Sequence, residues 1–263
     1  LLVVDCRFDL SDTARGERAW AKAHLPGAVY ANLDRDLSDL SRPGLGRHPL
    51  PDPDSFAAVL VRWGWTPATQ VVAYDDAGGA TAARLWWMLR LIGHHDAAVL
   101  DGGFPDWVAA GLPLTHDVPF AAACDVDIGY DPGQVVYAAE LERELAADRV
   151  LLLDARGAAR FRGEVEPIDK VAGHVPGAQN RPYTENLGVD GGFKPASDLR
   201  NEFETLLGEF TPDHVVHMCG SGVTACHNLL AMEHAGLAGS RIFAPSWSGW
   251  IADAQRPVAR GVA

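Results

Sequence analysis

The sequence repeats itself, because three blocks of residues recur in the same order in its two halves. LLVVDCR at 1–7 is matched by VLLLDAR at 150–156, AHLPGAVY at 23–30 by GHVPGAQN at 173–180, and QVVAYDDAGGATAARLWWML at 70–89 by HVVHMCGSGVTACHNLLAM at 214–232. Corresponding residues are separated by nearly constant intervals, as with Asp5 and Asp154, His24 and His174, and Asp75 and Cys219. Two tandem copies of one domain explain this order and spacing.

A stretch without periodicity joins the two copies. Residues 115–134 read THDVPFAAACDVDIGYDPGQ and contain two prolines and two glycines, which are typical of loops rather than of helices or strands. The sequence therefore predicts a first domain at 1–118, a linker at 119–134 and a second domain at 135–263, with the boundary near residue 125.

Each copy alternates short apolar runs with amphipathic segments. In the second copy, 150–153 and 214–218 predict strands, and 197–210 predicts a helix because its apolar residues share one face; these residues are Leu199, Phe203, Leu206, Leu207 and Phe210. Such alternation indicates an α/β fold in which each domain is a parallel sheet covered by helices on both faces. Ligands bind at the carboxyl ends of the strands in these sheets. The turn CGSGVTAC at 219–226 follows a predicted strand directly.

This turn has the composition of an anion-binding loop around a cysteine. Gly220 and Gly222 permit a tight backbone that points several N–H groups inward, and the helix expected after the loop adds the positive end of its dipole. That field favours the thiolate form of Cys219, which is the nucleophilic form. The alternative is that Cys219 is a small buried residue that packs the end of a strand.

Three other chemistries of a loop cysteine fit less well. A tyrosine phosphatase needs an arginine where this chain has Ala225. A Cys/His hydrolase would use His217 or His227 and stays open as an alternative, although neither position is expected to place an imidazole over the sulfur. A metal site built from these histidines with Cys219 and Cys226 lacks the paired spacing of structural zinc motifs. We also expect that Cys226 does not form a redox pair with Cys219.

Charge and cysteine content limit the partners and the compartment. The chain has 35 acidic and 22 basic residues and a formal charge of -13, which disfavours nucleic acid and anionic membranes and leaves a small molecule as the expected ligand. No apolar stretch approaches the roughly 20 residues of a membrane span, and the first residues read as a strand rather than a leader. Four scattered cysteines favour a reducing cytoplasm over a disulfide framework.

Together these blocks resemble the two-domain rhodanese family of sulfurtransferases. The resemblance covers the doubled domain, GHVPGA with its partner AHLPGA, LLLDAR followed by RFRGE, the loop CGSGVTAC and the later SWSGW. It implies that the second copy forms a persulfide on Cys219, while the first copy is catalytically silent because Asp75 stands at the corresponding position. It also implies transfer of sulfane sulfur to cyanide or a thiol, with a thioredoxin-like protein among the acceptors and with neither a cofactor nor a metal.

The loop is similar to that of the mercaptopyruvate-type members, and this similarity implies roles for further residues. Ser221 would assist proton movement together with Asp34 and His48, and Arg160 would bind the carboxylate of the substrate. The remaining loop residues would bind the substrate with backbone groups; they are Gly220, Gly222, Val223 and Thr224.

One position departs from the pattern. Mercaptopyruvate-type members often carry a second carboxylate-binding arginine where this chain has Asp169, and the adjacent Lys170 lacks the planar fork of an arginine. This departure weakens the match, but the similarity of the loop still predicts 3-mercaptopyruvate as the sulfur donor, with thiosulfate as the alternative. A non-catalytic rhodanese-like module that binds partners is the alternative from another functional class.

Overall fold

The computed structural model describes residues 1–119 and 126–262, and these fall into two compact units. The first unit contains Leu1–Leu40, Leu50–Asp131 and Asp190–Gly192, and the second contains Ser41–Pro49, Pro132–Val189 and Phe193–Ala263. Residues 120–125 of the linker expected at 119–134, with the boundary expected near 125, lie outside the described residues. The division at 118 and 135 stays a prediction. Ser41–Pro49, here called the 41–49 segment, belongs to the second unit although it lies in the first half of the sequence.

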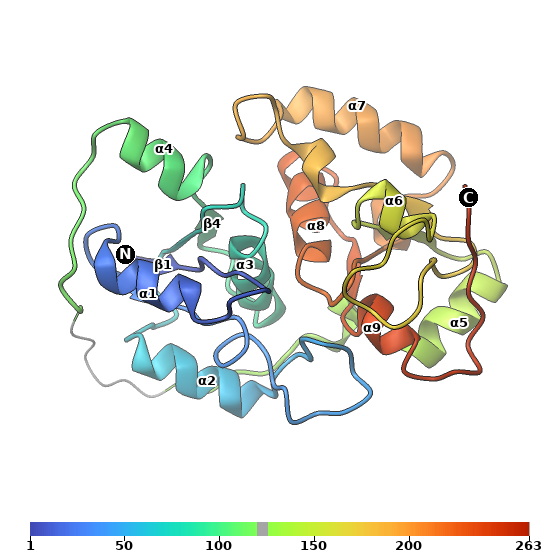
Figure 1. Cartoon of the computed structure of the whole chain (residues 1–263), viewed down its shortest axis with the longest axis horizontal. Helices are drawn as coiled ribbons and strands as arrows, with labels where there is room; N and C mark the ends of the chain where they lie inside the picture. The colour runs from blue at the N-terminus through green and yellow to red at the C-terminus, as the bar shows by residue number, and fades with distance from the viewer. Residues whose placement is uncertain (120–125, 263) are drawn as a thin grey trace. The chain divides into compact units, whose positions relative to one another are not determined.

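A four-stranded parallel sheet forms the first unit, with strand order β2-β1-β3-β4. The strands are β1 (Leu2–Asp5), β2 (Ala28–Tyr30), β3 (Val71–Tyr74) and β4 (Ala97–Val99). Four helices surround this sheet (Figure 1): α1 (Arg15–Lys22), α2 (Pro53–Arg62), α3 (Ala82–Leu91) and α4 (Gly103–Ala109). Asp52 caps α2 by accepting a hydrogen bond from the N–H of Ser55 at 2.8 Å.

The second unit contains a five-stranded parallel sheet with the order β5-β9-β8-β6-β7. Its strands are β5 (Val135–Val136), β6 (Leu151–Asp154), β7 (Gln179–Asn180), β8 (Val215–Met218) and β9 (Arg241–Phe243). Its helices are α5 (Ala138–Ala146), α6 (Ala158–Phe161), α7 (Ala196–Leu207), α8 (Ala225–His234) and α9 (Ser246–Trp250), and three short 3-10 turns lie at Pro132–Gln134, Tyr183–Asn186 and Pro212–His214.

The internal repeat appears as a repeated strand order. Read from β7, the second sheet runs β7-β6-β8-β9, which corresponds to β2-β1-β3-β4 with β5 added at one edge. A buried ion pair recurs at the carboxyl ends of the corresponding strands β1 and β6: Arg7 contacts Asp5 at 2.6 Å and Arg156 contacts Asp154 at 2.7 Å. Each arginine also donates a hydrogen bond to a backbone carbonyl, that of Ala23 in one copy and that of Gly173 in the other.

Both faces of the second sheet are buried. Neighbouring residues of β6 point to opposite sides of the sheet, and the residues on each side pack against helices. Leu152 packs in a cluster with residues of β8, α5, α6 and α9, whereas Leu151 and Leu153 pack in another with residues of α7 and α8. The prediction of parallel sheets with helices around them is therefore confirmed. The helix expected at 197–210 runs from Ala196 to Leu207, and Gly208, with φ of 57°, follows its last residue.

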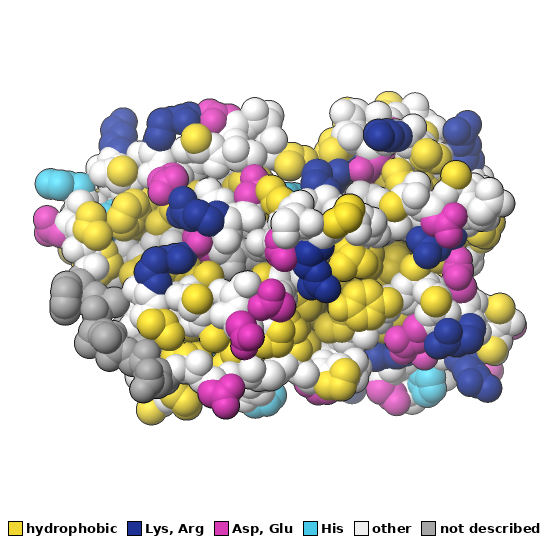
Figure 2. Space-filling model, turned by 90° about the horizontal axis from the view of Figure 1, so that it is seen from below, with side chains coloured by type: hydrophobic (Ala, Val, Ile, Leu, Met, Phe, Trp, Pro, Cys, Tyr) yellow, Lys and Arg dark blue, Asp and Glu magenta, His cyan; other side chains and the backbone are white. Residues whose placement is uncertain are grey.

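The surface carries charges of both signs. Figure 2 shows Lys and Arg side chains interspersed with Asp and Glu side chains over one face of the chain. In the part of the chain that the structure describes, no helix has both the length and the apolar character needed to cross a membrane.

Candidate active site around Cys219

Cys219 lies at the carboxyl end of β8, in the tight turn that leads into α8. The residue is only 2% exposed, and the N–H of Gly222 donates a hydrogen bond to its sulfur at 3.2 Å. Gly222 has φ of +79°, and a β-carbon at this position would lie 2.4 Å from the carbonyl oxygen of Ala244. Only glycine meets both conditions without strain. The local sequence therefore folds into the loop that directs an N–H group at the sulfur.

Helix α9 supports this loop through hydrogen bonds. The hydroxyl oxygen of Ser246 accepts a hydrogen bond from the N–H of Cys219 at 3.1 Å, and the N–H groups of Trp247 and Ser248 donate to the carbonyls of Cys219 and Gly220 at 3.0 and 2.9 Å. Ser246 is fully buried and has φ of +52°, a conformation that costs free energy for a residue other than glycine. Sequence reasoning missed this support, because it used SWSGW only as one block of the family resemblance; the two serines beside the tryptophans were the available signal.

The corresponding loop of the first unit is filled by its own side chain. Asp75 is 1% exposed, and its carboxylate accepts hydrogen bonds from four backbone N–H groups at 2.8 to 2.9 Å. These donors belong to Ala77, Gly79, Thr81 and Ala82. The turn of the first copy is thus an anion-binding loop, and the anion that it binds is a carboxylate of the chain.

Two of the predicted catalytic residues lie in direct contact. Nδ1 of His48 and the hydroxyl of Ser221 form a hydrogen bond of 2.8 Å, and the two residues are 4% and 6% exposed. This contact joins the 41–49 segment to the Cys219 loop inside the second unit. Asp34 belongs to the first unit, where its N–H donates to Oδ1 of Asn32 at 2.9 Å. Its part in proton transfer stays a prediction.

Arg160 lies beside the loop in a network of charged side chains. Its guanidinium contacts Glu166 at 2.8 Å and Asp169 at 3.1 Å. Asp169 also binds Arg47 at 2.6 Å, so one carboxylate bridges two arginines. Burial acts to raise the pKa of Glu166, but hydrogen bonds from Arg160 and from the backbone N–H groups of Asp169 and Ile168 outweigh burial and hold this pKa below its ordinary value. Glu166 is therefore anionic at neutral pH.

Arg47 was not among the residues singled out from the sequence. A β-carbon at Gly220 would lie 3.1 Å from Nη2 of Arg47 and 3.7 Å from both terminal nitrogens of Arg160. Two guanidinium groups therefore lie beside Gly220, the residue that follows Cys219. Gly220, Gly222, Val223 and Thr224 form the turn that leads into α8; their contact with a substrate stays a prediction.

The histidines near the loop are engaged elsewhere in the core. His217 is fully buried, and its Nε2 hydrogen-bonds to the hydroxyl of Ser240 at 3.2 Å. Nδ1 of His227 accepts a hydrogen bond from the side-chain amide of Asn186 at 3.1 Å. Neither contact orients an imidazole for a Cys/His hydrolase. Within the described residues, no three His, Cys, Asp or Glu side chains are grouped to hold a metal ion.

We expect His217 to make the fold sensitive to acid. Burial lowers the pKa of His217 to about 3 from the reference value of 6.5. Because the unfolded chain takes up this proton below pH 6.5 and the folded chain does not, stability falls as the pH falls. Between pH 7 and pH 5 the loss from this group is about 2 kcal/mol. Denaturant unfolding at the two pH values measures the loss, which His217→Asn should reduce by that amount; an equal loss in the variant and the wild type would contradict the prediction.

Cys226 lies near the start of α8. Its thiol donates a hydrogen bond to the carbonyl of Gly222 at 3.3 Å, and neither it nor Cys219 forms a disulfide. We expect Cys226→Ser to retain turnover within about threefold under reducing conditions, because a serine hydroxyl can donate the same hydrogen bond. Steady-state assays with excess dithiothreitol test this expectation, and a loss of turnover beyond tenfold would indicate that the two cysteines cooperate.

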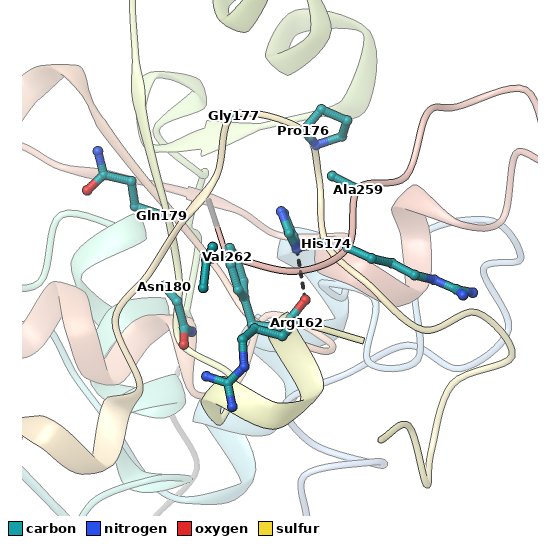
Figure 3. Close-up of a pocket in the computed structure, with 10 residues that line it drawn as sticks. Arg162, His174, Pro176, Gly177, Gln179, Asn180, Ala259 and Val262 are labelled. Atoms are coloured by element: carbon teal, nitrogen blue, oxygen red, sulfur yellow. Dashed lines mark hydrogen bonds between the residues drawn. The ribbon is translucent and has the colours of Figure 1, made fainter. Parts of the chain in front are cut away.

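A cavity of about 630 Å³ lies elsewhere in the second unit (Figure 3). It is lined by Phe161, Arg162, His174, Pro176, Gly177, Gln179, Asn180, Ala259, Arg260 and Val262. His174 hydrogen-bonds to the carbonyl of Phe161 at 2.8 Å and supports the turn that follows it. None of the lining residues belongs to the Cys219 loop.

The fold and the cysteine loop define a family. The model of the rhodanese-like domain matches residues 1–110 and 137–253, and the chain belongs to this family. Its two parallel sheets carry one loop with a cysteine and one with an aspartate at corresponding positions.

Particular relatives are sulfurtransferases. A Pseudomonas aeruginosa protein named "Probable 3-mercaptopyruvate sulfurtransferase" is 50% identical over 99% of this chain and 93% of its own length. SseB of Mycobacterium tuberculosis, which bears the name of a thiosulfate sulfurtransferase, is 39% identical over 99% of this chain and 91% of its own. The solved structure of 3-mercaptopyruvate sulfurtransferase from Leishmania major has a TM-score of 0.81 and 33% identity, and covers 94% of this chain and 68% of that chain.

Proposed function

We propose that this protein is a sulfurtransferase that takes sulfur from 3-mercaptopyruvate onto Cys219 and passes it to a thiol or to cyanide. The observation that carries this proposal is the hydrogen bond between His48 and Ser221, which places a proton-transfer pair in the loop of the buried nucleophile. The names of the relatives support the same activity.

In the first half-reaction, the thiolate of Cys219 attacks the sulfur of the donor. The new S–S bond forms while the C–S bond breaks, and its electron pair passes to the methylene carbon as the enolate of pyruvate. The thiol proton of the donor moves through Ser221 and His48 to that carbon. The products are pyruvate and a Cys219 persulfide anion, which the N–H of Gly222 and the other loop N–H groups stabilise.

In the second half-reaction, the acceptor attacks the outer sulfur of the persulfide. The S–S bond breaks and its electron pair returns to Cys219, so that cyanide leaves as thiocyanate and a thiolate leaves as its own persulfide. Small thiols and a thioredoxin-like protein are the acceptors that we propose. The compartment that we propose is the cytoplasm, where thiols are reduced.

Thiosulfate is the second candidate donor, and the observation that favours it is the pair of guanidinium groups beside Gly220. A dianion would be attracted by Arg47 and Arg160 together. Glu166 and Asp169, however, oppose these two positive charges with two negative ones. This balance favours a singly charged donor.

Intact-protein mass spectrometry distinguishes these functions. The protein is exposed briefly to 3-mercaptopyruvate or to thiosulfate, with Cys219→Ser as the control and with cyanide added afterwards to remove transferred sulfur. A gain of one sulfur from 3-mercaptopyruvate, absent from the variant and reversed by cyanide, is the expected result. A gain of sulfur from thiosulfate alone would show that thiosulfate, not 3-mercaptopyruvate, is the donor. No gain from either compound would favour the alternative that the protein is a non-catalytic module that binds partners.

A further inference from the structure

One serine of α9 makes hydrogen bonds to both chain segments that carry the proton-transfer pair. The N–H of Ser248 donates to the carbonyl of Gly220 at 2.9 Å, and its hydroxyl oxygen accepts from the backbone N–H of Arg47 at 2.9 Å. Gly220 directly precedes Ser221, and Arg47 directly precedes His48. Ser248 is therefore bonded to the residue before each member of the pair.

These contacts close a ring, whose remaining link is the hydrogen bond of 2.8 Å between Nδ1 of His48 and the hydroxyl of Ser221. Two sides of the ring are single covalent steps along the chain, and the other sides are hydrogen bonds. The place of Ser248 therefore limits how far the imidazole and the hydroxyl can separate. A separation of about 3.6 Å is no longer a hydrogen bond, so a shift of about 1 Å in either segment would break the link.

The 41–49 segment approaches α9 so closely that glycines are required at the contact. A β-carbon on Gly46, whose φ is +93°, would lie 2.4 Å from the carbonyl oxygen of Pro245. A β-carbon on Gly249 would lie 3.2 Å from the backbone nitrogen of Gly46. Only glycine leaves room for backbone to pack on backbone in this way. Close packing and the hydroxyl of Ser248 together hold the segment against α9.

In the first copy, the residue that corresponds to Ser248 is Pro105. The correspondence follows from the N–H of the preceding residue, which donates to the carbonyl of Asp75 in one copy and to that of Cys219 in the other. A proline has neither an N–H nor a hydroxyl, so it can form neither of the two hydrogen bonds. The shared fold therefore does not require them, and they occur in the copy that contains Cys219.

We propose that Ser248 is a positioning residue that holds His48 at hydrogen-bond distance from Ser221 during the first half-reaction. The proposal rests on the proposed function. In that half-reaction the thiol proton of 3-mercaptopyruvate must reach the methylene carbon of the product. Attack of cyanide on the persulfide forms thiocyanate and the Cys219 thiolate without any proton transfer. Loss of the Ser248 hydroxyl should therefore slow the first half-reaction and spare the second.

Single-turnover kinetics separate the two half-reactions. We would measure pyruvate release by the wild type, Ser248→Ala and Ser248→Thr after mixing with 3-mercaptopyruvate, and thiocyanate formation after mixing the desalted persulfide forms with cyanide. Ser248→Ala should release pyruvate about 10-fold more slowly, because positioned proton transfer contributes about 10²–10⁴-fold and the pair would be displaced rather than removed. Its rate of thiocyanate formation should stay within about twofold of the wild-type rate. Ser248→Thr, which keeps the hydroxyl, should recover most of the loss.

Ser197→Ala is the matched control. The hydroxyl of Ser197 contacts Asp198 at the exposed start of α7 in the same unit, so both rates should be unchanged in this variant. Equal slowing of both half-reactions in Ser248→Ala would indicate a general disturbance of the Cys219 loop and would overturn the proposal. An unchanged rate of pyruvate release would overturn it as well.

A crystal structure of Ser248→Ala tests the proposal independently of the sulfur donor. It should show Nδ1 of His48 and the hydroxyl of Ser221 at least about 3.6 Å apart, beyond hydrogen-bond distance. A separation that stays at 2.8 Å would refute the positioning role. Failure of the wild type to release pyruvate would instead overturn the proposed function, and the crystal structure would still decide whether Ser248 places His48.

Discussion

The Cys219→Ser variant is expected to lose sulfur transfer by at least about a thousandfold, because a serine hydroxyl neither ionises near neutral pH nor forms a persulfide. The fold should persist, since the substitution retains the size of the side chain and an acceptor for the N–H of Gly222, which now donates to the sulfur at 3.2 Å. Pyruvate release from 3-mercaptopyruvate, followed enzymatically, measures the activity, and circular dichroism measures the fold.

Cys226→Ser is the matched control for this experiment. It makes the same chemical change in a second buried thiol, and it lies just after the loop at the start of α8. Appreciable pyruvate release by Cys219→Ser, with an unchanged fold, would mean that sulfur transfer does not pass through Cys219. An equal loss in both variants would point to disturbance of the loop rather than to loss of the nucleophile.

The Asp75→Ala variant should destabilise the first unit by about 3–5 kcal/mol, because four backbone N–H donors, three of them buried, lose a charged acceptor at once. These donors now bind the carboxylate at 2.8 to 2.9 Å. Chemical denaturation followed by tryptophan fluorescence measures the free energy of unfolding. Sulfate should stabilise Asp75→Ala more than the wild type, because the vacated loop presents N–H groups to an anion.

The neighbouring Asp76→Ala supplies the comparison. Asp76 pairs with Arg15, whose side chain is 45% exposed, and removing such a pair costs at most about 1 kcal/mol. If the free energy of unfolding of Asp75→Ala lies within about 1 kcal/mol of the wild-type value, the stability of the loop does not depend on the carboxylate of Asp75. A stability of Asp75→Ala that does not respond to sulfate would show that the loop collapses once it is vacated.

The sequence predicts the fold well because the information for it is local. Runs such as 150–153 and 214–218 are short, apolar and separated by amphipathic helices, which leaves few arrangements other than a parallel sheet. The helix predicted at 197–210 agrees with α7 to within three residues at either end. The observed helix ends earlier than predicted because Gly208 follows its last residue. Because the domain occurs twice in the sequence, each of these patterns can be recognised in two places.

From the residues alone, without the family resemblance, the candidate site is predictable only where its chemistry lies within one short stretch. Cys219 and the glycines of its loop are recognisable from the local sequence. The resemblance to the family indicates Ser221 and His48, and the structure shows a hydrogen bond between them. Arg47 and Asp169 form their ion pair across 122 positions of the chain, and Ser248 reaches Arg47 across 201. Neither pair follows a period or a motif, so only the folded chain brings them to notice.

The placement of the 41–49 segment with the second unit has an evolutionary consequence. A gene shortened to its second copy would encode Cys219 without the two residues, Arg47 and His48, that the first half contributes to the same unit. Selection for an intact second unit therefore bears on both halves of the gene, even though the first copy has Asp75 where the second has Cys219. Such a duplication is hard to reverse by deletion, because the first half of the chain supplies a segment that packs in the second unit.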